Sequence, residues 1–394
     1  MGTLYFDHAA SAPLRDEARA ALDTWFARTG NPSATHAAGR LMRTAVEEAR
    51  EQVAACLGAR PGDIVFTSGG TESDNLAVKG LAQAAPAGRT HVVTSSVEHP
   101  AVRESVRWLA GRGHETTEVP AASDGVVAAD DVFEAVRPDT AVVSIMAANN
   151  EIGAINDLAT IGGELRERGV PFHVDAVQAV ATLPVDVRTW PCDGLSLSAH
   201  KFGGPQGVGI AYLRSGVPIE PVQHGGGQDR GVRSGTMPAA LIAACGAALE
   251  AAIADRDDLH GRLEGFRKLL VDRLVAVEGI RVNGPADPDR RLASHLHLSI
   301  DGVTPDALSL ALDRAGLQAS SASACVSGAG KASHVVEACR IDGDAVLRLS
   351  MGATTIADEV EEAATILTDA VLRLRAGEPV VQRTSAGPRD RVVG

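Results

Sequence analysis

The chain has 394 residues, of which 45% are apolar, 22% are charged and only 3% are aromatic. This composition predicts a globular protein with an aliphatic core, long enough for two domains. The formal net charge of -13 disfavours nucleic acid and anionic membranes as partners, because both would repel the average surface.

The amino-terminal segment, from Met1 to Ser11, has no basic region followed by an apolar stretch, so we expect no export. The chain contains five cysteines, an odd number without paired spacing. Such a pattern predicts reduced thiols rather than disulfides. The expected location is therefore the cytoplasm.

Between about residues 17 and 217, helical patterns alternate with short apolar runs. This alternation is typical of a mainly parallel sheet covered by helices. The predicted helices are Arg15 to Arg28, Arg40 to Leu57 and Ser73 to Gln83. The predicted strands are His91 to Thr94, Ala141 to Met146, Phe172 to Val174, Gly194 to Leu197 and Gly209 to Leu213.

A second region follows a predicted long helix from Pro238 to about Glu278. Its predicted strands are His295 to Ile300, Leu317 to Ser321 and Val346 to Ser350, and its helices are Pro305 to Ala315 and Ala357 to Arg375. We therefore expect an α/β protein with a large domain over residues 15–258 and a smaller α/β C-terminal domain. The smaller domain takes residues 1–14 and 259–375. Residues 376–394 lack apolar periodicity and are expected to form a disordered tail.

The first segment that suggests chemistry runs from Thr67 to Asn75, after the apolar run Ile64 to Phe66. A strand, a glycine turn and a helix start place free backbone N–H groups around one point, where an anion binds. A capped helix after a tight turn explains the same residues, so this segment alone does not decide between the two readings.

Asp175 is expected at the carboxyl end of a buried strand, which is where ligands bind in open α/β sheets. A carboxylate there can pair with a protonated ring nitrogen, and Gln178 can reach a neighbouring oxygen of the same ring. Taken alone, Asp175 can equally well cap a helix.

Lys201 gives the most specific signal, because it leaves an apolar strand and enters a glycine-rich turn that ends at Gly209. A lysine in such surroundings is desolvated enough to lower its pKa and form an imine. Ser198 and His200 flank it and can donate to a phosphate. The glycines indicate close backbone approach rather than an open surface loop.

This lysine segment resembles that of the class V aminotransferase family, specifically the cysteine desulfurases of the NifS and IscS type, which are fold-type I pyridoxal-phosphate enzymes. The resemblance covers nearly everything except the tail. It runs through Asp7-His8-Ala9-Ala10, Gly30-Asn31-Pro32-Ser33, Gly69 to Asn75, Glu98 to Val102, Asn149 to Gly153, the Asp175 and Lys201 segments, Arg233-Ser234-Gly235-Thr236, Ser320 to Cys325 and Leu347 to Ser350.

The resemblance implies pyridoxal 5'-phosphate as cofactor and a role for each matching residue. Lys201 resembles the Schiff-base lysine, Asp175 the partner of the pyridine nitrogen, and Gln178 a donor to the ring hydroxyl. His99 is similar to the imidazole that stacks on the ring and transfers protons. The implied phosphate ligands are Gly70, Thr71, Ser198 and His200.

Thr236 is similar to a residue that reaches the phosphate of the neighbouring subunit, which implies a homodimer. Asn150 and Arg348 resemble the groups that hold the substrate, L-cysteine, with the arginine gripping its carboxylate. No metal is implied, and no cysteine or histidine pair has the spacing that predicts zinc.

Cys325 resembles the thiol that takes the sulfur of L-cysteine as a persulfide and leaves L-alanine. Small residues from Ser327 to Ser333 follow it and suit a loop that delivers the sulfur to an acceptor protein, for iron-sulfur clusters, tRNA thiolation or other sulfur biosynthesis. The remaining cysteines are expected to be buried and inert, namely Cys56, Cys192, Cys245 and Cys339.

Two positions depart from the family pattern: Ala12 replaces a common threonine, and Ala322 a common glycine. They affect the expected rate and substrate preference more than the reaction class. Two alternatives remain: a selenocysteine lyase or another class V enzyme, and a noncatalytic scaffold for sulfur trafficking. A Cys325→Ala variant addresses the first alternative, and the colour of a bound cofactor the second.

Overall fold

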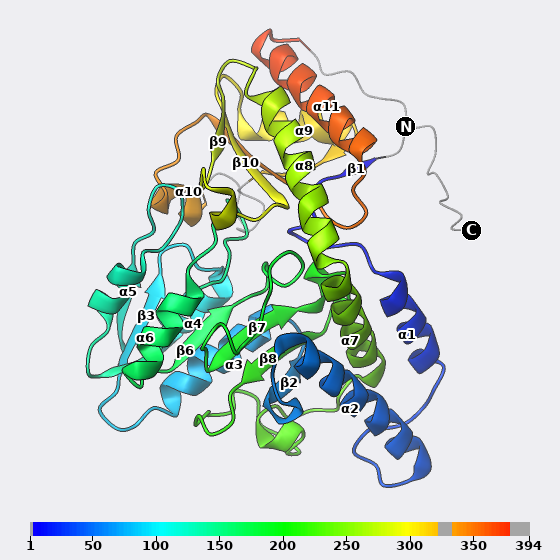
Figure 1. Ribbon diagram of the computed structural model, residues 1–394, viewed down its shortest axis with the longest axis vertical. Coiled ribbons are helices and arrows are strands. Elements are labelled where there is room, and N and C mark those ends of the chain that lie inside the picture. Colours follow the sequence, from blue (N-terminus) through cyan, green and yellow to red (C-terminus); the bar gives the residue numbers. More distant parts are fainter. Residues whose placement is uncertain (1–2, 322–332, 379–394) are drawn as a thin grey trace.

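The computed structural model describes residues 3–321 and 333–378 and is arranged around two sheets (Figure 1). The larger sheet of this part of the chain has seven strands in the order β2-β8-β7-β6-β5-β3-β4. Its strands are β2 (Ile64–Thr67), β3 (His91–Ser95), β4 (Glu115–Val119), β5 (Thr140–Ser144), β6 (Phe172–Asp175), β7 (Gly194–Ser198) and β8 (Gly209–Leu213). Most of these strands are buried on both faces, as expected for apolar runs between layers of helices.

The predicted mainly parallel sheet covered by helices is confirmed, with one exception in strand direction. Strand β8 runs antiparallel to both of its neighbours, β2 and β7. The reason is the short connection between Ser198 and Gly209, which leaves no room for the crossover that a parallel pair requires. Strands β2 and β7 consequently point the same way.

Helices cover the larger sheet and pack in groups. The group α1 (Asp16–Phe26), α2 (Ala37–Leu57) and α7 (Ala239–Ala254) packs together, and α3 (Gly70–Gln83) packs on α4 (Pro100–Ala110) and on β7 and β8. A further pair is α5 (Ala129–Ala135) and α6 (Leu158–Glu167). The 3-10 turns are η1 (Pro61–Asp63), η2 (Ala199–Lys201), η3 (Asp229–Gly231) and η4 (Pro288–Arg290).

The smaller sheet is antiparallel, in the order β12-β13-β10-β9. Its strands are β9 (Ile280–Asn283), β10 (His295–Ile300), β12 (Ser320–Ser321) and β13 (Ala345–Ser350), and β1 (Leu4–Tyr5) pairs separately with β11 (Leu317–Gln318). The helices of this region are α8 (Arg256–Leu274), α9 (Pro305–Arg314), α10 (His334–Ala338) and α11 (Ala357–Arg375).

The long helix predicted from Pro238 to Glu278 is wrong in detail, because it is divided at Asp255 into α7 and α8. The two helices serve different cores: α7 packs in the core of the larger sheet, whereas α8 packs in that of the smaller sheet (Figure 1). The predicted strand from Leu317 to Ser321 is likewise two short strands with different partners.

Two segments that are far apart in sequence pack in different apolar cores. Leu4 and Phe6, at the start of the chain, pack in the core of the smaller sheet. Val335 and Cys339, on and just after α10, pack instead in the core of the larger sheet. The amino-terminal segment thus runs between the two sheets, where it can contribute to a site shared by both.

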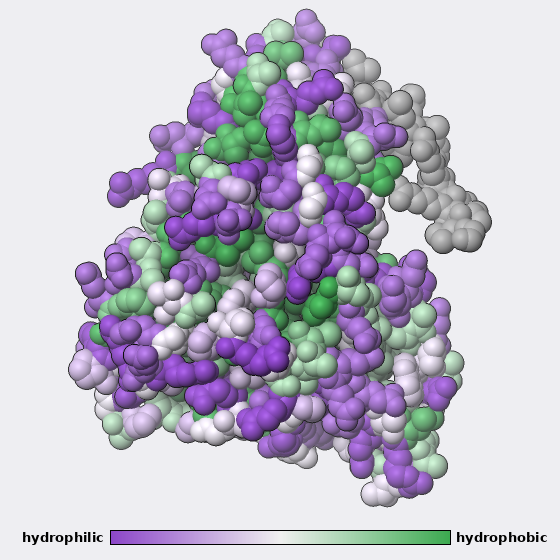
Figure 2. All heavy atoms as spheres, in the orientation of Figure 1, coloured by the Kyte–Doolittle hydropathy of each residue, from purple (hydrophilic) through white to green (hydrophobic). Residues whose placement is uncertain are grey.

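Hydrophilic side chains dominate the lower part of the face in Figure 2, while hydrophobic side chains gather in its upper part, over the smaller sheet and its helices. Exposed apolar residues of that region include Val275, Leu310 and Leu372. None of the helices in residues 3–321 and 333–378 is both long and apolar enough to cross a membrane.

Candidate active site

The carboxyl ends of the parallel strands meet along one edge of the larger sheet and surround a cavity of about 240 Å³. The ends of β2, β3, β5, β6 and β7 supply parts of the lining, as expected for a ligand site in an open α/β sheet. The contributing residues are Gly70 and Thr71 after β2, His99 after β3, Met146 and Asn150 after β5, Asp175 on β6, and Ser198, His200 and Lys201 after or on β7.

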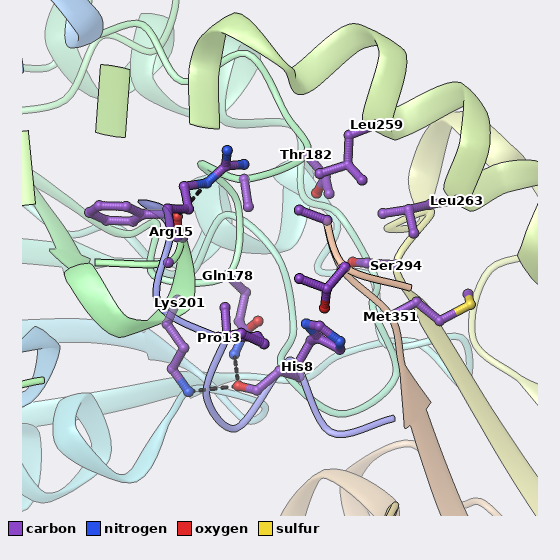
Figure 3. Close-up of a pocket in the computed structure, with 18 of the residues that line it drawn as sticks. His8, Pro13, Arg15, Gln178, Thr182, Lys201, Leu259, Leu263, Ser294 and Met351 are labelled. Atoms are coloured by element: carbon purple, nitrogen blue, oxygen red, sulfur yellow. Dashed lines mark hydrogen bonds between the residues drawn. The ribbon is translucent and has the colours of Figure 1, made fainter. Parts of the chain in front are cut away.

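Lys201 is turned towards the amino-terminal segment by the 3-10 turn η2. Its Nζ donates to the carbonyl oxygens of Ala9, at 2.6 Å, and Ala10, at 3.0 Å. The side-chain amide of Gln178 donates to the same Ala9 oxygen at 2.9 Å (Figure 3). The predicted lysine and glutamine are therefore brought together at one backbone carbonyl.

Two buried carboxyl groups and one imidazole form a cluster in the cavity wall. Ligand atoms of Asp74, His99 and Asp175 all lie within 4.8 Å of one another. Burial raises the pKa of Asp175, opposed by His99 and Lys201. Burial and the nearby Asp175 raise the pKa of Asp74 well above its usual value. A cation placed beside this cluster would be stabilised and would restore the ionised form of Asp175.

His99 caps α4, and its Nδ1 accepts a hydrogen bond from the Ala101 N–H at 3.1 Å. Burial lowers the pKa of His99, with Asp175 opposing the shift. Because Nδ1 is an acceptor, the neutral ring carries its proton on Nε2. His99 therefore has one nitrogen fixed by the backbone and the other left to exchange a proton within the cavity.

Another part of the cavity lining suits an anion. It combines the first turn of α3, at Gly70 and Thr71, with the side chains of Ser198 and His200. A Cβ atom at Gly70 would lie 2.8 Å from Cγ2 of Val177, so this position requires glycine. Burial, together with Lys201, lowers the pKa of His200 to about 4. Backbone N–H groups and hydroxyls are the donors that bind phosphate at helix starts.

An ion pair links the start of α3 to the segment around Arg233, which is far from it in sequence. Arg233 donates to both carboxylate oxygens of Glu72, at 2.8 and 3.2 Å, and one of these oxygens accepts from the Ser68 N–H at 2.7 Å. These contacts lower the pKa of Glu72 against the opposing effect of burial. The segment that carries Thr236 is thereby held beside the turn before α3.

Arg348 lies on β13 of the smaller sheet and closes the cavity from that side. It is buried, and its guanidinium donates to the Asn150 carbonyl oxygen at 2.8 Å and to the Asp7 carboxylate at 2.6 Å. The predicted pair of substrate-binding residues, Asn150 and Arg348, is thus in direct contact. Asp7 was not predicted as their neighbour.

Two predicted residues are not placed in this cavity. Thr236 is exposed and does not line it, and Cys325 lies outside the described residues. Ala322 also lies outside them, whereas Ala12 lines a neighbouring cavity.

Sequence reasoning gave no role to three groups that the fold brings in: Asp74, Asp7 and the Ala9 carbonyl. Asp74 had a signal, since it lies one helical turn after Gly70 and hence on the same face of α3. Asp7 lies in the first segment of the family resemblance, but its contact with Arg348 had no signal because the two residues are 341 positions apart. The Ala9 carbonyl had none, because a backbone carbonyl carries no sequence signature.

A family model described as aminotransferase class-V matches residues 4–362. The chain is 42% identical to an IscS-like cysteine desulfurase of Mycobacterium tuberculosis, over 91% of this chain and 93% of that protein. A solved NifS-like protein is 32% identical with a TM-score of 0.88, covering 94% of this chain and 99% of the other. A structure of SspA in complex with cysteine is 32% identical with a TM-score of 0.78, covering 90% of this chain and all (100%) of the other.

Proposed function

The chain belongs to the class-V aminotransferase family, and on that premise we propose that it is a cysteine desulfurase that converts L-cysteine to L-alanine. The sulfur is placed on Cys325 as a persulfide and passed on to an acceptor. The observation that carries the proposal is the convergence of Lys201, His99 and Asp175 on one cavity, closed by Arg348.

The family depends in general on pyridoxal 5'-phosphate, and we propose that this cofactor binds in the cavity. The cavity residues fit such a group, because the buried carboxyl cluster favours a cationic ring nitrogen and the start of α3 favours a phosphate. When bound, pyridoxal phosphate supplies an electron-accepting ring that stabilises negative charge at the substrate Cα.

Four side chains are proposed to hold the ring. Lys201 would hold it through its amine, and the same amine would be placed to take the Cα proton of the substrate. Asp175 would keep the ring nitrogen protonated, Gln178 would donate to the ring hydroxyl, and His99 would lie against the ring. The backbone contact at Nδ1 of His99 leaves its Nε2 to exchange protons, which supports this assignment.

The phosphate is proposed to bind Gly70, Thr71, Ser198 and His200. Thr236 would contact it from the neighbouring subunit, so that the protein is a homodimer. The exposure of Thr236 supports this role, because a residue that serves a second subunit must be accessible from outside its own chain.

Asn150 and Arg348 are proposed to hold the substrate carboxylate. The Cys325 thiolate then attacks the substrate sulfur: a bond forms between the two sulfur atoms while the substrate Cβ–S bond breaks. The electron pair of that bond stays with the carbon fragment, which takes up protons and leaves as alanine. No external oxidant or reductant is needed for this step.

The test is mass spectrometry of the purified protein after it is mixed with L-cysteine. We expect one added sulfur atom on Cys325 and alanine in the solution. A Cys325→Ala variant should lose both, whereas Cys56→Ala is the matched control and should keep both. Burial raises the pKa of Cys56 to about 11, so that this thiol is protonated and unreactive at neutral pH.

The outcomes separate the competing functions. Undiminished sulfur release from Cys325→Ala would refute the desulfurase assignment, and turnover of selenocysteine alone would identify a selenocysteine lyase. A protein that stays colourless after addition of pyridoxal phosphate would indicate a noncatalytic scaffold.

The wider setting is also proposed. The enzyme would act in the cytoplasm and deliver sulfur through the Cys325 segment to an acceptor protein, for iron-sulfur clusters, tRNA thiolation or another biosynthesis. We further propose the division into a large domain over residues 15–258 and a small domain over residues 1–14 and 259–375. The separation of two apolar cores supports it.

A further inference from the structure

A second cavity, of about 90 Å³, adjoins the proposed cofactor cavity, and Figure 3 shows side chains that line it. It is bounded by the amino-terminal segment, helix α8 and the chain that follows β13. The two cavities share part of their lining, namely Ala9, Val177, Gln178 and Lys201. The second cavity therefore lies where the two apolar cores and the active site meet.

Its walls are mainly apolar but include one unsatisfied hydroxyl. Leu259 and Leu263 of α8 and Met351 contribute the apolar surface (Figure 3). Within the described part of the chain, the lining residue Thr182 carries a buried hydroxyl oxygen without a hydrogen-bond partner. Thr182 is more than nine-tenths buried. An unpaired polar atom of this kind indicates a missing water or ligand.

The two histidines of the lining already have partners. The ring of His295 is hydrogen-bonded to the Ser294 hydroxyl at 2.9 Å and to the Asn150 backbone. The ring of His8 is hydrogen-bonded to the Tyr5 backbone. The Thr182 hydroxyl is therefore the polar group that a ligand in this space can use.

The cavity offers hydrogen bonds without a free charge. Burial lowers the pKa of His8 to about 4 and that of His295 to about 3, so both rings are neutral at physiological pH. Two cations line the cavity: Arg15 is paired with Asp255 at 2.7 Å and also donates to the Phe202 carbonyl. Lys201 donates to the Ala9 and Ala10 carbonyl oxygens and, on the proposed function, is bound to the cofactor. An ionic ligand would lose its hydration without gaining a partner of opposite charge.

The volume restricts the size of the occupant. A dry apolar cavity of about 150 Å³ admits benzene, and one water needs roughly 10–15 Å³ of such space. This cavity is smaller than the first and much larger than the second. We propose that it binds a small uncharged molecule with a short apolar body and one hydroxyl or amide group.

Through the shared wall, a ligand in this cavity can influence the active site. This consequence rests on the proposed function. The Ala9 carbonyl holds both Lys201 and Gln178, and the Ala9 N–H donates to the Ser350 hydroxyl at 2.9 Å. Ser350 directly precedes Met351 of the cavity lining. An occupant would touch the backbone that positions the proposed catalytic lysine, and it should therefore alter turnover.

The test uses tert-butanol as probe and the full-length protein with bound pyridoxal phosphate, labelled with ¹³C at its methionine methyl groups. Met351 reports on the new cavity, Met146 on the cofactor cavity, and Met42 on the distant core. A Met351→Leu variant assigns the reporter signal. We expect a saturable shift at Met351 alone, and this readout does not depend on desulfurase activity.

Two variants at Thr182 test the chemistry. Thr182→Val removes the hydroxyl at nearly constant size and should weaken tert-butanol binding about fivefold, the value of one neutral hydrogen bond. Thr182→Met fills the cavity and should abolish the shift. Both must retain the cofactor absorbance of the unmodified protein, which shows that they fold.

Four results would overturn the proposal. The first is a shift at Met351 that never saturates, and the second is one that survives Thr182→Met. The third is an absent shift in a protein whose crystals show only ordered water in this cavity. A saturable shift at Met146 alone would place the probe in the cofactor cavity and would also refute the inference.

Discussion

Replacing Glu98 by glutamine should change how the stability of this protein depends on pH. Glu98 is fully buried in the segment between β3 and α4, and one of its oxygens accepts from the Ser95 hydroxyl at 2.6 Å and from the Met146 N–H at 2.8 Å. Its other oxygen has no partner in the described part of the chain. Burial raises the pKa of Glu98 to about 8, although both hydrogen bonds act in the opposite direction.

The direction of the effect follows from proton binding. Between the ordinary pKa of 4.5 and the folded value of about 8, the folded protein holds a proton that the unfolded chain has lost. Glu98 therefore contributes stability that is fully present below pH 4.5 and is lost as the pH rises through 8. At about 1.4 kcal/mol per pH unit, the loss over this window is at most roughly 5 kcal/mol.

The assay is urea unfolding of the cofactor-bound protein at several pH values between about 5 and 8.5, the range in which the effect develops. Glu98→Gln does not titrate, so its free energy of unfolding relative to the unmodified protein should rise by several kcal/mol across this range. The matched control is Glu104→Gln on α4, the helix that begins just after Glu98, where the carboxylate is exposed and the pH profile should be unchanged. A difference between Glu98→Gln and the unmodified protein that stays constant within about 1 kcal/mol would refute the reasoning.

Three further changes test other parts of the site. Arg348→Lys keeps the positive charge but cannot form the bidentate hydrogen bonds of a guanidinium with the substrate carboxylate. KM for L-cysteine should therefore rise about tenfold or more, while the cofactor absorbance persists. Glu72→Ala removes the partner of Arg233 and should lower the free energy of unfolding by about 1–2 kcal/mol in urea; Glu72→Gln should lose less. Burial lowers the pKa of His173 to about 3, so stability should fall as the pH drops from about 6.5 towards 3, where only the unfolded chain binds the proton. Circular dichroism in acid should show a smaller loss for His173→Gln, and an equal loss would contradict this explanation.

Local patterns were sufficient for much of the fold. The strands that carry Asp175 and Ser198 were predicted to within a residue or two, because apolar runs between helices have few alternatives. The family resemblance, rather than local patterns, placed Gly70, Asp175 and Lys201 in one site, and all three line one cavity at the carboxyl ends of the strands. The position of the break at Asp255 was missed, because the helical pattern continues through it and only packing against two cores divides it.

The sequence by itself determined the strand-and-helix alternation, the family and the residue types of the site, because these depend on neighbours along the chain and on motif spacing. Only the tertiary structure decided that Asp7 holds Arg348, that Asp74 joins His99 and Asp175, and that a second cavity adjoins Lys201. Each of these features requires contact between segments far apart in sequence. Such contacts follow from how the two sheets and the amino-terminal segment pack together, and no local pattern records that packing.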